Sequence, residues 1–218
     1  MILFLILLSV CVYILYITTR DRVFIDENGK VVSHKELEVE EQEIASKYIK
    51  KNDKVLELGA RYGTVSAIIL DKIADTKNCV IVDPDTNITQ ALTNNLNACG
   101  YEDARIFVGT IGSHKKKIHS NDSYATYTES CEGDECNIEN MTYDNLQRKY
   151  DITFNTIVAD CEGCLPELID HIEDMDPIKK IIFETDRAGN VDYNKLYTKL
   201  NECGFKNVRE GFVQIWVK

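Results

Sequence analysis

The feature that most limits the fold of this chain is the alternation of short apolar stretches with helical stretches after residue 53. Buried strands are predicted at residues 54–58, 79–82, 105–108, 156–159 and 180–183. Helices are predicted between and after them, at residues 65–73, 88–98, 143–149, 166–172 and 193–200. Strands that alternate with helices form parallel βαβ units with helices on both faces of the sheet. We therefore predict an α/β domain with a doubly wound sheet over residues 53–218, closed by strands within residues 208–217.

The segment before this domain, residues 20–52, is predicted to be a hairpin followed by a helix. A turn signal at Glu27, Asn28 and Gly29 separates two short apolar pieces, which is typical of a hairpin. Apolar residues at helical spacing then predict a helix over residues 36–50. Inside the main domain, the polar stretch at residues 112–140 has no periodicity, and we predict one long loop there. Loops of this length are uncommon and often functional.

The chain begins with an uncharged apolar run at residues 2–17. As a helix, this run and the two threonines after it would span about 27 Å, close to the hydrocarbon thickness of a thin bilayer. We predict a transmembrane anchor over residues 1–19, with the membrane contacted through residues 2–19. A cleaved signal peptide fits less well, because no positive region precedes the run and no small-residue cleavage site follows it. A buried core helix is the other alternative.

A glycine turn joins the first strand of the main domain to its first helix, with the sequence ELGARYG at residues 57–63. Gly59 lets the backbone turn tightly and approach a ligand, and Gly63 lets the helix begin close to the strand. The turn lacks the G-x-G-x-x-G spacing of nicotinamide-binding turns. Glu57 would repel a pyrophosphate and attract an ammonium group. Many ordinary turns share this glycine spacing, so the motif by itself is weak.

The second strand ends at Asp83, which lies more than 20 residues after the first glycine. An acidic residue at this place can accept hydrogen bonds from both hydroxyl groups of a ribose. The alternative is that Asp83 only caps the following helix. Because the glycine turn and Asp83 occur together at the expected spacing, we favour a nucleoside-binding site.

The strand at residues 156–159 ends in two carboxylates, Asp160 and Glu162. At the carboxyl edge of a sheet they could position and deprotonate an acceptor hydroxyl, or hold a divalent ion that does so. The alternative is helix capping and compensation of the helix dipole. Glu184 and Asp186 follow the next strand and extend the same acidic rim, which is compatible with plain solvation as well as with a metal.

These motifs, taken in order, resemble the FkbM-type methyltransferase family. The matching pieces are ELGARYG, VDPD at residues 82–85, TYDNL at residues 142–146, ADCEG at residues 159–163 and IIFET at residues 181–185. The resemblance covers about residues 54–208. It implies a Rossmann-like fold of the class I methyltransferase type, S-adenosylmethionine as the cofactor, and O-methylation of a sugar or another small hydroxyl acceptor.

The resemblance also implies roles for individual residues. The methionine end of the cofactor would lie against four residues of the first turn: Glu57, Gly59, Ala60 and Gly63. Asp83 would bind the ribose. Asp160 and Glu162 match the carboxylates at the edge where the methyl group is transferred. No separate metal site is implied, although a divalent ion at these carboxylates stays open.

Three positions depart from the family pattern. The usual lysine two residues before Asp160 is Val158, the usual glutamate after the D-x-E-G signature is Leu165, and the usual asparagine of the first turn is Arg61. These positions concern the acceptor side more than the cofactor side. The alternative function is therefore an inactive, membrane-tethered module that binds the cofactor without turning it over.

The net charge and the cysteine content limit which partners and ligands we expect. The net charge of −11 repels phosphate backbones, so we expect no nucleic-acid partner. The chain has eight cysteines, and in a domain with its own core free thiols are the expected state. The weaker alternative is a zinc site formed by four of them: Cys131, Cys136, Cys161 and Cys164.

The predicted location is a membrane, with a single pass and the catalytic domain in the cytoplasm. Arg20 and Arg22 follow the apolar run, and positive residues favour the cytoplasmic side. The glycosylation acceptor at Asn87 lies just after Asp83, where a glycan would obstruct the ribose site. Free thiols also favour the cytoplasm.

Overall fold

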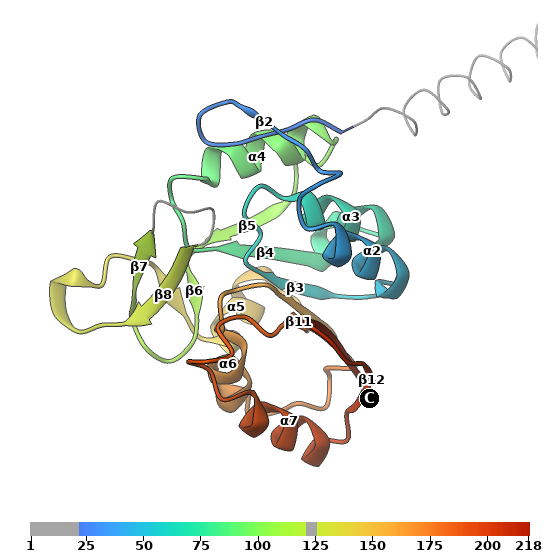
Figure 1. Ribbon diagram of the computed structural model, residues 1–218, viewed down its shortest axis with the longest axis vertical. Helices are drawn as coiled ribbons and strands as arrows, with labels where there is room; N and C mark the ends of the chain where they lie inside the picture. Colours follow the sequence, from blue (N-terminus) through green and yellow to red (C-terminus); the bar gives the residue numbers. More distant parts are fainter. Residues whose placement is uncertain (1–21, 121–125) are drawn as a thin grey trace, which may run out of the picture.

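The computed structural model describes residues 22–120 and 126–218 of the chain. The predicted anchor at residues 1–19 lies outside these residues. Within the described part, no helix is both long enough and apolar enough to cross a bilayer. The described residues form three layers, with a central sheet between two groups of helices (Figure 1).

The central sheet has seven strands in the order β12-β13-β11-β10-β3-β4-β5. Their bounds are β3 (Val55–Leu58), β4 (Cys79–Asp83), β5 (Arg105–Val108), β10 (Thr156–Ala159), β11 (Lys180–Glu184), β12 (Lys206–Arg209) and β13 (Val213–Val217). Strands from β5 to β11 pair in parallel, whereas β13 is antiparallel to both β11 and β12. The predicted doubly wound sheet is confirmed, and its strand order reverses between β3 and β10.

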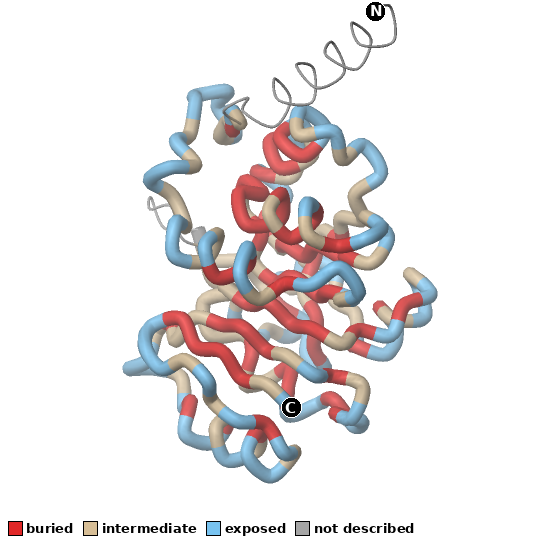
Figure 2. The backbone as a smooth tube through the Cα atoms, turned by 90° about the vertical axis from the view of Figure 1, so that its right-hand side faces the viewer, coloured by how far each residue is buried: buried red, intermediate tan, exposed pale blue. Residues whose placement is uncertain are grey.

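Different helices cover the two faces of the sheet, because side chains alternate along each strand. Leu56 and Leu58 of β3 belong to a core cluster shared with α5 (Tyr143–Tyr150), α6 (Leu165–His171) and α7 (Tyr193–Glu202). Val55 of the same strand belongs to the opposite cluster, shared with α2 (Val39–Tyr48), α3 (Thr64–Lys72) and α4 (Thr89–Ala98). The central strands are therefore buried along most of their length (Figure 2). Every helix predicted within the described residues is present, although α2 begins three residues later than expected.

The predicted hairpin before the main domain is present as β1 (Phe24–Ile25) and β2 (Val31–Val32). Asn95 of α4 is buried and holds it in place. Its side chain accepts a hydrogen bond from the Ile25 amide and donates one to the Ile25 carbonyl, both at 2.9 Å. The same side chain donates to the Tyr62 carbonyl at 3.0 Å. The hairpin and the glycine turn are thus fixed by one residue.

The prediction of one long loop at residues 112–140 is wrong. β7 (Lys116–Ser120) and β8 (Thr126–Ser130) form an antiparallel hairpin, and β9 (Asn140–Met141) pairs with β6 (Thr110–Ile111). Two short 3₁₀ helices, η1 (Thr76–Asn78) and η2 (Gly133–Glu135), complete the elements of the described residues. The β7–β8 hairpin is only partly buried, so its strands lack the apolar alternation that sequence patterns detect. The remaining signal is the threonine and tyrosine content of β8, because both have high β-propensity.

The prediction of free thiols is wrong for four cysteines. Disulfide bonds join Cys131 to Cys136 and Cys161 to Cys164, with Cα–Cα distances of 5.7 and 5.4 Å. Each pair flanks a tight turn that brings its Cα atoms within bridging distance. The alternative of a zinc site built from these four residues is also wrong, because their sulfur atoms are paired. The argument for a cytoplasmic location that rested on free thiols is lost with them.

Candidate functional site

Three pockets that share Gly59 lie at the carboxyl ends of the parallel strands, around the point where the strand order reverses, and we call them together the crevice. Ligands of doubly wound sheets bind at this place. We distinguish three parts by their lining residues. The acidic part is lined by five carboxylates, which lie in the sheet, directly after β10, or in and directly before α2: Glu38, Glu41, Glu57, Asp160 and Glu184. The middle part is lined by Arg61, Asp83, Asp160 and Glu162. The hairpin part is lined by Pro84, Gly109, Lys116, Tyr127 and Glu167, among others.

Gly59 lines all three parts of the crevice. Its φ of 83° is left-handed, and a Cβ atom at this position would lie 1.5 Å from the carbonyl oxygen of Asp160. The Gly59 amide donates to the Val82 carbonyl at 2.9 Å, and the Asp160 amide donates to the Leu58 carbonyl at 3.0 Å. Only glycine fits here, because the turn after β3 touches the backbone after β10.

Gly63 begins α3 with a φ of 83°. A Cβ atom at this position would lie 2.9 Å from Leu92 Cδ1 and 3.2 Å from Leu96 Cδ2. The contact that excludes a side chain is therefore with α4. The sequence-based reason for this glycine, a close approach of α3 to its own strand, is corrected accordingly.

Asp83 lies at the end of β4, as predicted, and its carboxylate holds the glycine turn. Asp83 Oδ2 accepts a hydrogen bond from the Arg61 amide at 2.8 Å, and Oδ1 accepts one from the Asp85 amide at 2.9 Å. Arg61 has a left-handed φ of 44°, and its guanidinium pairs with Asp85 at 3.2 Å. Burial raises the pKa of Asp83. Ala60, buried in the same turn, packs in the cluster on the α3 side of the sheet.

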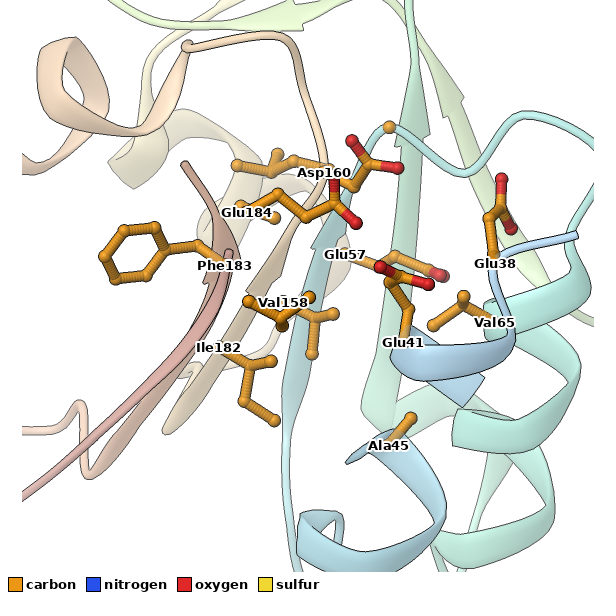
Figure 3. A pocket seen from close by; sticks show the side chains of 14 residues that line it. Glu38, Glu41, Ala45, Glu57, Val65, Val158, Asp160, Ile182, Phe183 and Glu184 are labelled. Atoms are coloured by element: carbon orange, nitrogen blue, oxygen red, sulfur yellow. The ribbon is translucent and has the colours of Figure 1, made fainter. Parts of the chain in front are cut away.

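Glu57 is a buried ionisable side chain on a strand whose other residues are apolar. It alternates with Leu56 and Leu58 along β3, lies on the side of the sheet covered by α2 and α3, and is 2% exposed. Burial raises its pKa to about 8. Its Oε2 atom is buried and has no hydrogen-bond partner among the residues that the structure describes. In Figure 3 the carboxylates of Glu57 and Glu41 point toward the same space in the acidic part.

Asp160 stands among further carboxylates. One oxygen each from Asp160, Glu184 and Asp186 can be chosen so that all three lie within 4.8 Å of one another. Burial and the charge of Asp186 raise the pKa of Asp160 to about 8. Burial and a hydrogen bond with Glu41 raise the pKa of Glu184 to about 11. Both groups therefore hold protons more tightly than ordinary carboxyls, and a bound positive charge would favour their ionised forms.

Glu162 lies in the middle part of the crevice and does not line the acidic part. Its φ of 54° is left-handed, and Gly163 follows with a φ of 88°. The disulfide between Cys161 and Cys164 closes this turn. Burial raises the pKa of Glu162. The two predicted catalytic residues thus meet in the middle part, and only Asp160 also lines the acidic part.

Two contributors to the crevice were not predicted from the sequence. Glu38, which precedes α2 with a left-handed φ of 52°, and Glu41 in the first turn of α2 complete the acidic part. The β7–β8 hairpin supplies the wall of the hairpin part, and Arg187 from the loop after β11 lies 4.1 Å from the centre of the Tyr127 ring. Neither contribution has a local motif, because each depends on long-range packing against the sheet edge.

The chain matches no known family model and no curated protein. It is similar to a solved structure described as a protein in the NADB-Rossmann superfamily from Streptococcus agalactiae. That likeness has a TM-score of 0.51 and 9% identity, and covers 81% of this chain and 67% of the other. It shows that the fold is Rossmann-like.

Two methyltransferases give weaker likenesses. A precorrin-6y C5,15-methyltransferase from Geobacter metallireducens has a TM-score of 0.49 and 13% identity, over 84% of this chain and 89% of its own. A putative tRNA (m1A22) methyltransferase from Streptococcus pneumoniae was solved with S-adenosyl-L-methionine. Its TM-score is 0.47 and its identity 11%, and the match covers 82% of this chain and 72% of the other.

Proposed function

We propose that the protein is an S-adenosylmethionine-dependent methyltransferase that methylates a hydroxyl group of a sugar or another small acceptor. The observation that carries this proposal is the position of Gly59 as a common wall of the acidic, middle and hairpin parts of one crevice. A nucleoside with a positively charged tail needs three such environments side by side. Carboxylates suit the tail, an acidic residue suits the ribose, and an apolar wall suits the base.

The acidic part fits the tail of the cofactor. S-adenosylmethionine carries a sulfonium and an ammonium group, and the residues that line the acidic part include five carboxylates and neither lysine nor arginine. Glu57 Oε2 supports the fit, because it has no hydrogen-bond donor within the described part of the chain, and such a buried oxygen costs free energy that an ammonium group would recover. Glu57 would hold the ammonium group.

The middle and hairpin parts fit the nucleoside. Asp83 lines the middle part and would accept hydrogen bonds from the ribose, which is the usual role of an acidic residue after this strand. Leu58, Val82, Pro84 and Ile111 line the hairpin part with apolar surface, against which the base would pack.

The transfer step would depend on Asp160. When bound, the cofactor supplies an electrophilic methyl group on its sulfonium. Asp160, shared by the acidic and middle parts, would take the proton from the acceptor hydroxyl, and a raised pKa makes it a stronger base once it is deprotonated. Glu162 would orient the acceptor from the middle part, because transfer requires the hydroxyl to lie opposite the leaving group.

A divalent ion is the alternative means of activating the hydroxyl. The carboxylates of Asp160, Glu184 and Asp186 are close enough to share one ion, and hard cations prefer such oxygen donors. A chelator separates the two mechanisms, because only the metal-assisted reaction would stop.

The sheet supports a methyltransferase over a nicotinamide-dependent enzyme. Numbered along the chain, its strands run 3-2-1-4-5-7-6, with the last strand inserted antiparallel. The common dinucleotide-binding order is 3-2-1-4-5-6. The net charge of −11 also favours a small acceptor over a nucleic acid.

The inactive binding module is the second candidate, and Val158 favours it. Val158 lies directly opposite Glu57 in the β10–β3 register and lines the acidic part. The family to which the sequence is similar has a lysine at this position. A lysine there would place a positive charge among the carboxylates, whereas valine leaves them uncompensated.

Binding and transfer must be measured separately to decide between these candidates. Calorimetry of the purified chain with S-adenosylmethionine tests the cofactor site, and labelled cofactor with panels of glycans and lipids tests transfer. The Asp160→Asn variant should keep the binding affinity and lose about 100- to 10,000-fold in transfer rate, while Asp144→Asn, exposed on α5, should change neither. Binding without transfer to any acceptor would favour the inactive module. No binding would refute the cofactor site.

The proposal includes attachment to a membrane through residues 2–19, with the catalytic domain on the cytoplasmic side. Deletion of residues 1–21 should release the chain into the soluble fraction. If the domain in sealed membranes resists protease until detergent is added, the prediction that it faces the cytoplasm is wrong.

A further inference from the structure

A second group of polar side chains lies where α6 meets the β7–β8 hairpin, outside the acidic and middle parts of the crevice. It consists of His114, which precedes β7, and Glu167 and His171, both on α6. One ligand atom from each of the three lies within 4.8 Å of the others. We propose that these residues, here named the histidine cluster, bind a divalent transition-metal ion, and that zinc is the best fit.

The local structure brings the three ligands together. Glu167 and His171 are four residues apart on α6, so their side chains lie one above the other on one helix face. His114 reaches them from the other side of the junction. The His114 and His171 rings meet edge to face, with centroids 6.0 Å apart and an interplanar angle of 78°. The rings are therefore not stacked on each other.

Glu167 gives the strongest indication of a missing partner. Its Oε2 atom accepts a hydrogen bond from Lys116, whose ammonium also donates to Ser130 Oγ at 3.1 Å. Its Oε1 atom is buried and has no hydrogen-bond partner among the described residues. An unsatisfied buried oxygen is costly, and a metal ion would satisfy it. The contact with Lys116 would fix the orientation of the carboxylate.

His171 is also held by a neighbour. Ser113 Oγ lies 2.9 Å from His171 Nε2, within hydrogen-bonding distance. Metal ligands in proteins are usually held by such outer contacts. Lys116 on the glutamate and Ser113 on the histidine give two of the three ligands a positioning partner.

The donor set distinguishes this cluster from the carboxylates near Asp160. Two imidazoles and one carboxylate are a ligand set that zinc uses when a fourth position is left to water. Three carboxylates suit magnesium, calcium or manganese instead. An ion at the histidine cluster would join the β7–β8 hairpin to α6. Because Lys116 and Glu167 also line the hairpin part of the crevice, the ion would fasten that wall.

The proposal can be tested on the full chain after its metals are removed with a chelator. Elemental analysis after zinc addition should find one zinc ion per chain, and cobalt titration should produce the visible d–d absorption band of a four-coordinate ion. His114→Ala, His171→Ala and Glu167→Gln should each weaken binding by about 100-fold or more, because loss of even an outer partner costs 10- to 100-fold. Zinc should also slow tryptic cleavage at Lys115, which is exposed beside the cluster.

Two control variants make the result specific. His119→Ala removes a partly exposed histidine of β7 that is paired with Glu129 at 3.0 Å, and should leave zinc binding unchanged. Asp186→Asn changes the carboxylates near Asp160 and should also leave it unchanged. The proposal is overturned if neither zinc nor cobalt binds at micromolar concentration, if the three cluster variants bind as wild type, or if Asp186→Asn abolishes binding. Circular dichroism of each variant checks that it is folded.

Discussion

Glu57→Gln should stabilise the protein at neutral pH, because burial makes the ionised form of the native glutamate unfavourable. The folded-state pKa of Glu57 is about 8, against an ordinary value of 4.5. Below pH 4.5 both the folded and the unfolded chain bind the proton, so burial of the group has no charge-related cost. As the pH rises above 4.5, the unfolded chain releases the proton and the folded chain keeps it. The cost to the folded state then grows by about 1.4 kcal/mol per pH unit and levels off above pH 8.

The magnitude follows from these two values. At pH 7 the cost is about 3 kcal/mol, and glutamine, which does not ionise, avoids it. The burial of an amide in place of a carboxyl adds a contribution that does not depend on pH. The informative quantity is therefore the change in the stability difference between pH 4 and pH 7, which should be about 3 kcal/mol in favour of the variant.

Urea unfolding of wild type and Glu57→Gln at several pH values between 4 and 9 measures this difference. Glu202→Gln, an exposed residue at the end of α7, is the matched control and should show no such change. A stability difference that is the same at pH 4 and pH 7 would refute the burial argument. The same variant should bind S-adenosylmethionine more weakly, since glutamine carries no charge for the ammonium group. Unchanged affinity would remove Glu57 from the proposed cofactor site.

Three further outcomes test the rest of the site. Gly63→Ala should destabilise the chain by about 1–3 kcal/mol through its left-handed φ, and further through the contact of the new Cβ with α4. Gly100 also has a left-handed φ, of 91°, but open space where a Cβ would lie, so Gly100→Ala should show the backbone cost alone. Equal losses of stability in thermal unfolding would contradict the contact with α4. Asp83→Asn should weaken cofactor binding about 10- to 150-fold, from the 1.5–3 kcal/mol of a charge-assisted hydrogen bond, whereas Asp75→Asn, which alters a similar exposed turn, should bind normally in calorimetry. The kcat/KM of methyl transfer should rise with pH up to about 8, because the base Asp160 must lose a proton whose pKa burial raises to about 8; a profile flat between pH 6 and pH 8 would assign the base elsewhere.

Much of the candidate site could be predicted because its residues follow strands directly. Asp83 and Asp160 are each the residue at which a buried apolar stretch ends, and parallel strands bring their carboxyl ends to one edge. Gly59 was predicted for the same reason, although the structure identifies the backbone of Asp160 as the neighbour that requires it. The contribution of Glu41 could not be predicted, because nothing in the charged sequence of α2 indicates which sheet edge the helix packs against.

The sequence by itself determined the order of strands and helices, because apolar periodicity and glycine turns act over short distances along the chain. It also determined which residues leave the sheet at its carboxyl edge. Only the tertiary structure decided how the crevice is enclosed by α2 and by the β7–β8 hairpin, which cysteines pair, and that His114 meets Glu167 and His171. The physical reason is that these features depend on contacts between residues far apart in sequence. Such contacts are set by packing of the whole chain, and they leave no periodic pattern in the partly exposed segments that make them.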